Sequence, residues 1–242
     1  MTKQNSLFYI NSKDGAEMVL VPGGWFLMGS DENDPDAENR EKPLHLHWLA
    51  PFYISITCVT VGQFKQFVRE TGYANDEDWD SDPSDHPVKH INWHDAKDYC
   101  EWAGLRLPTE AEWELSARGY GALKYPWGND WENGRRVCWD KPTGPECNTT
   151  PVFDHPDGVS NMGTFQQSGN IWEWCEDNWD EKAYKRYVKG DFEPPAASNF
   201  RVLRGGSWNF NSPRLFRGAF RYDYPQFRSL NLGFRTARTV NF

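Results

Sequence analysis

The stretch "PVKHINWHDAKDYCEWAGLRLPTEAEWELSARG", residues 87–119, decides the fold because it predicts two helices in close succession. The segment WHDAKDYCEWAG has the pattern of a short helix that ends at Gly104. Thr109 and Glu112 have the spacing of a capping box, and Gly119 closes the helix that they open. The centre of the chain is therefore expected to be helical.

The segments on either side predict one more helix and several strands. Thr60 and Gln63 repeat the capping-box spacing and predict a helix over 61–72. The segment MVLVPGGWFLMGS (18–30) is typical of two strands joined by a Pro-Gly-Gly turn, and PLHLHWLAPFYIS (43–55) alternates like a strand. After residue 120 we expect no further helix. The pattern indicates an α+β fold with short helices beside a small, irregular, mainly antiparallel sheet and much loop.

Charge is distributed unevenly along the 242 residues, whose formal net charge is −9. The whole molecule is therefore not expected to bind nucleic acid. Residues 201–242, however, carry eight arginines, no lysine and one acid. These arginines indicate either an anionic partner or structural forks that pair with buried carbonyls and acids. The acidic segment 31–42 is interpreted as a solvated loop.

The five cysteines do not form a dense framework, so we expect free thiols. A bridge between Cys138 and Cys147 remains an alternative in an oxidising compartment. No apolar run is long enough for a membrane span, and the first residues lack the apolar core of a signal peptide. We expect a cytoplasmic protein, unless a leader was removed.

Six motifs then occur in one order: MVLVPGGWFLMGS, the stretch 87–119, YPWGND, GNIWEW, RVLRGGSW and NLGFR. Together they closely resemble the formylglycine-generating-enzyme, or sulfatase-modifying-factor, family. The resemblance implies a single domain with a C-type-lectin-like fold over 16–242, after an N-terminal segment, 1–15. In GNIWEW the two tryptophans stand two residues apart and are expected on one side of a strand.

The resemblance also implies a cysteine pair, similar to a soft-ligand copper(I) site, between the GGS and LGFR motifs. Residues 207–232 contain no cysteine; Ser212, Phe216 and Gly218 stand in that neighbourhood instead. We therefore expect no copper and no enzymatic activity. A formylglycine-generating-type oxidase or a divergent oxidoreductase remains the alternative.

Calcium binders of the family imply a second site near GNIWEW. Glu173 and the carbonyl groups of Gly169 and Ile171 match that pattern, and Gln166 replaces the family's upstream Asn. The alternative is that Glu173 is a buried acid paired with an arginine.

The segment 208–235 resembles the C-terminal variable region of proteins that diversity-generating retroelements mutate, in which Asn codons become codons for other residues. The scaffold positions of that pattern are retained at Gly205, Gly206, Trp208, Arg217, Arg221, Arg228, Gly233, Phe234 and Arg235. The positions interpreted as variable and ligand-binding are Phe210, Ser212, Leu215, Phe220, Tyr222, Asp223, Tyr224, Phe227, Ser229 and Leu230.

The sequence thus predicts a non-catalytic, monomeric protein whose diversified C-terminal surface binds a protein or other macromolecular ligand. Tyr and Phe suit such a surface because they provide large contact area at low entropic cost. Two alternatives to this surface stay open. The rings could fill the core, or the arginines and rings could bind an anion or nucleic acid.

Overall fold

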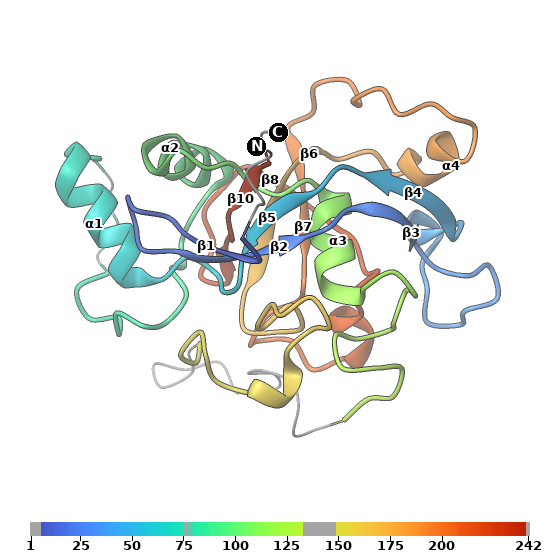
Figure 1. The fold of residues 1–242 in the computed structure, drawn as a ribbon, viewed down its shortest axis with the longest axis horizontal. Helices are drawn as coiled ribbons and strands as arrows, with labels where there is room; N and C mark the ends of the chain where they lie inside the picture. Colours follow the sequence, from blue (N-terminus) through green and yellow to red (C-terminus); the bar gives the residue numbers. More distant parts are fainter. Residues whose placement is uncertain (1–5, 75–76, 78, 133–148, 241–242) are drawn as a thin grey trace.

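The computed structural model describes residues 6–74, 77, 79–132 and 149–240, and its elements are short (Figure 1). The strands are β1 (Phe8–Ile10), β2 (Glu17–Val21), β3 (Gly24–Met28), β4 (His45–Leu49), β5 (Phe52–Ser55), β6 (Trp172–Asn178), β7 (Phe200–Arg204), β8 (Tyr222–Pro225), β9 (Leu232–Gly233) and β10 (Ala237–Thr239). The helices are α1 (Val61–Thr71), α2 (Trp93–Ala103), α3 (Glu110–Arg118) and α4 (Ala183–Tyr187). This mixture confirms the expected α+β class.

The described strands form three sheets instead of one. Their orders are β1-β2-β5-β10, β3-β4 and β8-β7-β6-β9. All neighbours are antiparallel except β6 and β9, which run parallel. Strand β10 pairs with β5, so the end of the described chain completes a sheet built from its beginning.

Two expected strand segments are each divided between sheets. The two strands of 18–30 do not pair with each other, because β2 pairs with β5 while β3 pairs with β4. The segment 43–55 is likewise not one strand, since it breaks between Leu49 and Phe52. At this crossing Gly23 has φ +73°, and a Cβ there would lie 2.5 Å from the carbonyl oxygen of Leu49.

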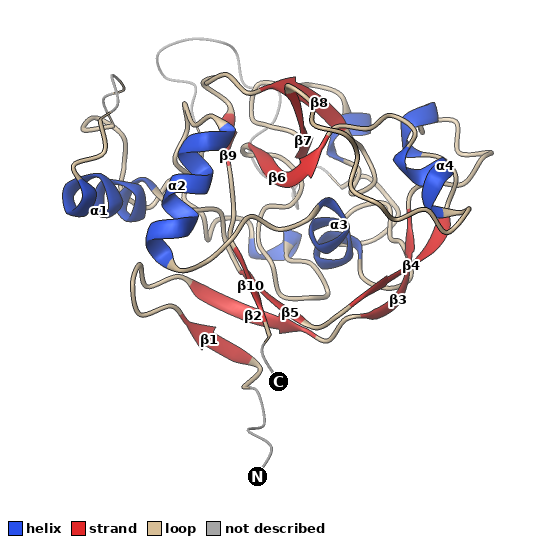
Figure 2. Ribbon diagram, turned by 90° about the horizontal axis from the view of Figure 1, so that it is seen from above, coloured by secondary structure: helices blue, strands red, loops and turns tan. Residues whose placement is uncertain are grey.

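The three helices expected before residue 120 are confirmed. Thr60 accepts from the backbone of Gln63, and Thr109 accepts from that of Glu112, each at 3.2 Å. Helix α3 lies between the two four-stranded sheets (Figure 2) and is buried along its whole length. The expectation of no later helix is wrong, because α4 follows β6. No side chain caps α4, so the sequence carries no capping signal for it.

The main core is aromatic and joins α1 and α2 to the β8-β7-β6-β9 sheet. It includes Phe64, Tyr99, Trp172, Trp174 and Phe234. Both tryptophans of GNIWEW are buried in it, as their spacing predicted. No helix of the described part of the chain has the length and apolar character that a bilayer crossing requires.

Candidate functional site: the C-terminal face

Buried arginines anchor the C-terminal segment to the centre of the molecule. Arg221 donates to both carboxylate oxygens of Glu110, at 2.6 and 2.7 Å. Arg204 bridges Glu110 and Glu114, at 3.2 and 2.5 Å, and also donates to the carbonyl groups of Gly218 and Ala219. The bidentate Arg221–Glu110 pair and the two bonds of Arg204 are buried, so they hold the backbone of the segment in one position on α3.

Two further arginines pair in the same way with distant acids. Arg217 donates to both oxygens of Glu41, at 2.6 and 2.8 Å. Arg235 donates to both oxygens of Glu173, at 2.5 and 2.8 Å. Glu41 is fully buried, so the description of 31–42 as a solvated loop is wrong at this residue. The structural interpretation of the arginines is correct for these four, and an anion would have to displace a carboxylate to reach them.

The two side chains expected to hold calcium, those of Gln166 and Glu173, are engaged with other protein groups in this structure. The oxygens of Glu173 accept from Arg235, from Trp113 Nε1 at 2.7 Å and from the Cys58 thiol at 3.2 Å. The side chain of Gln166 donates to the carbonyl of Pro151. Glu173 is thus the buried, arginine-paired acid of the alternative interpretation. The described residues contain no cluster of three or more His, Cys, Asp and Glu side chains suited to a metal.

Half-buried rings form the outer side of the segment. Tyr222 and Tyr224 stand two apart on β8 and therefore face the same way. Tyr222 stacks on Trp172 with ring centroids 5.4 Å apart, and Tyr224 lies 6.3 Å from Trp174. Phe210 meets the edge of Trp172 at 5.8 Å. Each of these three half-buried rings thus rests on a buried ring of β6.

The other expected ligand-binding positions divide into exposed and enclosed ones. Phe227 is 69% exposed and Leu230 is 43% exposed. Phe220 is only 2% exposed and belongs to the core, so its placement on the surface was wrong and core filling is correct for this ring. The remaining positions are half-buried: Phe210, Ser212, Leu215, Tyr222, Asp223, Tyr224 and Ser229.

Most expected scaffold positions are buried, which suits a supporting role. Buried positions are Gly205, Gly206, Trp208, Arg217, Arg221, Gly233, Phe234 and Arg235. Arg228 differs, because its side chain is 35% exposed while it donates to both oxygens of buried Asp95. At Gly206, φ is +76° and a Cβ would lie 2.6 Å from the Phe216 ring, so only glycine fits.

Two contributions to the face were not anticipated. Arg40, from the acidic segment, contacts Asp223 at 3.2 Å and lies over the Tyr222 ring at 5.6 Å. Asn231 donates to Ser207 and Asn209, both at 3.2 Å, and so ties the two ends of the segment together. The Arg40 contact spans 183 residues and has no local signal in the sequence.

None of the described cysteines is exposed on this face. Cys58, Cys100 and Cys175 are free and buried. Burial, followed by the charge of Glu173, raises the pKa of the Cys58 thiol, and burial raises the pKa of Cys175 as well. Cys138 and Cys147, proposed as a bridge, lie outside the described residues. The thiols of Cys58, Cys100 and Cys175 are therefore protonated and enclosed.

Comparison with known proteins identifies related enzymes. The formylglycine-generating enzyme of Thermomonospora curvata is 32% identical over 248 residues, covering 79% of this chain and 82% of that protein. Hercynine oxygenase of Mycolicibacterium smegmatis is 29% identical and covers 92% of this chain, which spans 61% of that protein's length. The expectation that the chain is not an enzyme is overturned by these relatives, although the cysteine pair is missing from 207–232.

Solved structures confirm the fold. PvdO from Pseudomonas aeruginosa superposes with a TM-score of 0.82 at 24% identity, covering 99% of this chain and 100% of that one. Treponema denticola variable protein 1 superposes with a TM-score of 0.73 at 20% identity, covering 96% and 98%. The resemblance to both enzymes and variable proteins of this fold is thus confirmed. The family model "Sulfatase-modifying factor enzyme 1-like domain" matches residues 4–240, and the chain belongs to that family.

Proposed function

We propose that the C-terminal face binds a protein or peptide ligand. The observation that carries this proposal is the support of Tyr222 and Tyr224 by buried Trp172 and Trp174. A ring held in place before binding loses little entropy when a ligand covers it, and tyrosine contributes both apolar area and a hydroxyl group. The face therefore has the properties of a preorganised binding surface.

The edge of the sheet supports a peptide as the ligand. Strand β8 is the outermost strand of its sheet and pairs only with β7 among the described strands. An extended peptide can add to such an edge through backbone hydrogen bonds, while side-chain pockets select its sequence. Exposed Phe227 and Leu230, which follow β8, extend the apolar surface beyond that edge.

The arginines support a protein or peptide over a nucleic acid. Four of them already form ion pairs with buried carboxylates of the same chain: Arg204, Arg217, Arg221 and Arg235. Phosphate contacts need accessible cations and give binding a steep dependence on salt. Binding at this face is therefore expected to change little with ionic strength.

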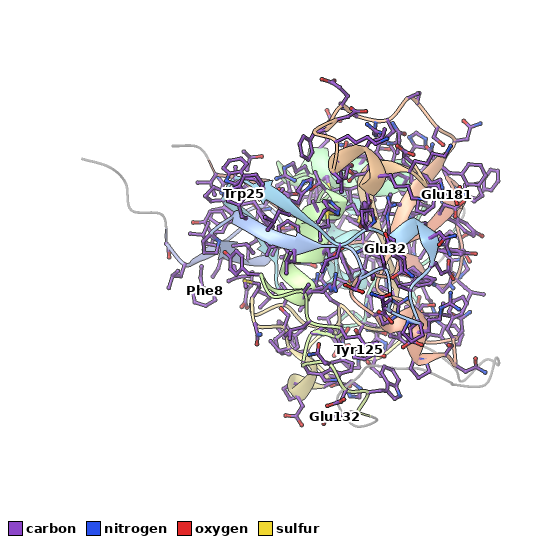
Figure 3. The ribbon with its side chains drawn as sticks, turned by 90° about the vertical axis from the view of Figure 1, so that its right-hand side faces the viewer. Phe8, Trp25, Glu32, Tyr125, Glu132 and Glu181 are labelled. Carbon is purple, nitrogen blue, oxygen red and sulfur yellow. The ribbon has the colours of Figure 1, made fainter. Side chains whose placement is uncertain are left out.

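A selection from a displayed random-peptide library on the immobilised protein tests this proposal. Tyr222→Ala and Phe227→Ala are each expected to reduce the affinity of the protein for the selected peptides by about 30-fold or more, the loss typical of a hot-spot ring. Phe8→Ala is the matched control, because Phe8 on β1 is 67% exposed and Phe227 is 69% exposed. Figure 3 labels Phe8 at the margin of the molecule. Equal loss from Phe8→Ala, or no loss from either face variant, would contradict the proposal.

We also propose that the half-buried and exposed positions of this face are diversified by a retroelement. The proposal predicts a reverse-transcriptase reading frame beside the gene. It further predicts a near-copy of the codons for 208–235 that differs only at adenines. Sequencing the flanking DNA checks both. If the flanking DNA contains neither the reading frame nor the near-copy, the proposal of diversification is wrong. The peptide selection would then still decide whether the face binds a ligand.

A further inference from the structure

A second candidate site lies away from the C-terminal segment, in a cavity of about 410 Å³ between the β3-β4 hairpin, the start of α3 and α4. This volume lies within the range of about 300–1,000 Å³ that is usual for small-molecule sites. The residues that line it include the aromatic residues Trp25, Trp48, Tyr187 and Phe192. Figure 3 shows Trp25 at the margin of the molecule.

Three aromatic rings of the lining pack together, and two exposed tryptophans from neighbouring strands belong to the same lining. Tyr187 stacks on Phe192 with centroids 5.5 Å apart, and His47 lies 5.3 Å from Tyr187 and 5.5 Å from Phe192. Trp25 and Trp48 stand opposite each other in the register of β3 and β4. They are 63% and 54% exposed, so much of each side chain is accessible to a ligand.

The polar groups of the cavity are acidic or neutral. Asp177 reaches it from the end of β6, and its Oδ2 accepts from the backbone N–H of Glu110 at 2.6 Å. The first N–H of α3 that would attract an anion is therefore already occupied by a carboxylate. No Lys or Arg belongs to the described lining, and Arg221 behind it is paired with Glu110. The charge distribution excludes an anionic ligand and favours a cation.

We propose that this cavity binds a small organic cation, a quaternary or methylated ammonium joined to an apolar group. Aromatic faces attract such cations, and a carboxylate at the inner end of the cavity supplies the opposite charge. The apolar group would fill the volume beside Met28 and Leu49. The inference is independent of the peptide-binding function proposed for the C-terminal face.

The ionisation of Asp177 gives the proposal a characteristic pH dependence. Burial, followed by the charge of Glu110, raises the pKa of Asp177 to about 7, and a bound cation favours its ionised form. Burial, followed by the charge of His45, lowers the pKa of His47 to about 4, so His47 stays neutral across this range. The titratable and charged groups that face Asp177 are Glu110 and Glu112 on α3, Arg221, Arg201 on β7, Cys175 on β6 and Tyr187 on α4.

Calorimetric titration with choline and with 3,3-dimethylbutan-1-ol, its neutral isostere, tests the proposal. Choline is expected to bind at least tenfold more tightly than the isostere at pH 8. Because the ionised fraction of a group with a pKa of about 7 rises about tenfold from pH 6 to pH 8, the choline affinity should rise by a similar factor. Equal affinity for the two probes at pH 8, or no saturable choline binding, overturns the proposal.

Variants separate the carboxylate from the rings. Asp177→Asn is expected to remove both the preference for choline and its pH dependence. Trp48→Ala should reduce the affinity for choline by tenfold or more. Leu46→Ala is the matched control, since Leu46 is 60% exposed on the same strand and is outside the cavity lining. A pH dependence that survives in Asp177→Asn contradicts the assignment. If a variant does not fold, the affinities of the wild-type protein for choline and for 3,3-dimethylbutan-1-ol decide the proposal.

Discussion

At the scale of single residues, Glu114 shows how this protein keeps buried charges stable. Its side chain is fully enclosed, and it accepts from Arg204 and Arg118, each at 2.5 Å. Burial alone would raise the pKa of Glu114, but the two guanidinium groups and the backbone N–H of Gly29 lower it to about 2. The carboxylate is thus ionised, and both arginines depend on it.

Glu114→Gln is expected to destabilise the protein by about 3–5 kcal/mol, because it leaves Arg118 enclosed without its carboxylate and Arg204 with Glu110 alone. Urea unfolding followed by circular dichroism measures the loss. Glu70→Gln is the control. Its partner Lys13 lies at the similar distance of 2.6 Å, but the pair is at the surface and little change is expected. A loss for Glu114→Gln no larger than that of the control would contradict the role of the buried pair.

The described thiols give a second prediction at this scale. Since Cys58, Cys100 and Cys175 are buried and their pKa values are raised chiefly by burial, they should resist alkylation in the folded protein. Iodoacetamide labelling with peptide mass mapping should modify all three only after unfolding in guanidinium chloride. Rapid labelling of Cys58 in the native protein would contradict its enclosure beside Glu173.

At the scale of elements, α3 matters more than its nine residues suggest. It supplies Glu110 to Arg221 and Arg204, and Glu114 to Arg204. It also touches the sheet of the C-terminal face and the β3-β4 hairpin. A shift of α3 would therefore move the anchors of the face and the inner end of the cavity together.

Thr109 caps α3 and Thr60 caps α1, so the two threonines allow a matched test of whether a cap on the buried helix contributes more to stability. Thr109→Ala is expected to cost about 1–2 kcal/mol, and Thr60→Ala about 0.5–1 kcal/mol, although both hydrogen bonds measure 3.2 Å. The reason is that α3 is buried throughout, whereas α1 buries only Val61, Phe64 and Phe67. Denaturant unfolding of both variants checks the order. A larger loss from Thr60→Ala would show that cap strength does not depend on burial here.

At the scale of the whole molecule, two buried carboxyl groups with opposite pKa shifts contribute to the dependence of stability on pH. Glu114 has a folded pKa of about 2, below its ordinary value of 4.5, so its stabilisation is complete above pH 4.5 and is lost toward pH 2. Asp177 has a folded pKa of about 7, above 3.8, so the folded state binds the proton more tightly and stability falls from about pH 4 to about pH 7.

The free energy of unfolding is therefore expected to peak near pH 4–5 as far as these two groups contribute. Urea titrations from pH 2 to pH 8 would measure the curve. Asp177→Asn should reduce the decline above pH 4, and Glu114→Gln should reduce the rise below pH 4.5. If the decline above pH 4 is as steep in Asp177→Asn as in the wild type, the assignment to this carboxyl group is wrong.

The sequence by itself determined the capped helices and the family. The caps at Thr60 and Thr109 form between residues three apart, so they can be recognised without knowing the fold. The shared side of Trp172 and Trp174 follows from strand periodicity alone. The ordered motifs sufficed for the family, but the missing cysteine pair did not suffice to exclude an enzyme.

Only the tertiary structure decided which residues meet across long separations. Arg217 and Glu41 are 176 residues apart, and Arg221 and Glu110 are 111 apart, so no local pattern could pair them. The same packing buried Phe220 while leaving Tyr222 half-exposed, and it enclosed Glu173 with Arg235. Burial is a property of what packs against a side chain, and those neighbours come from distant segments that the fold alone brings together.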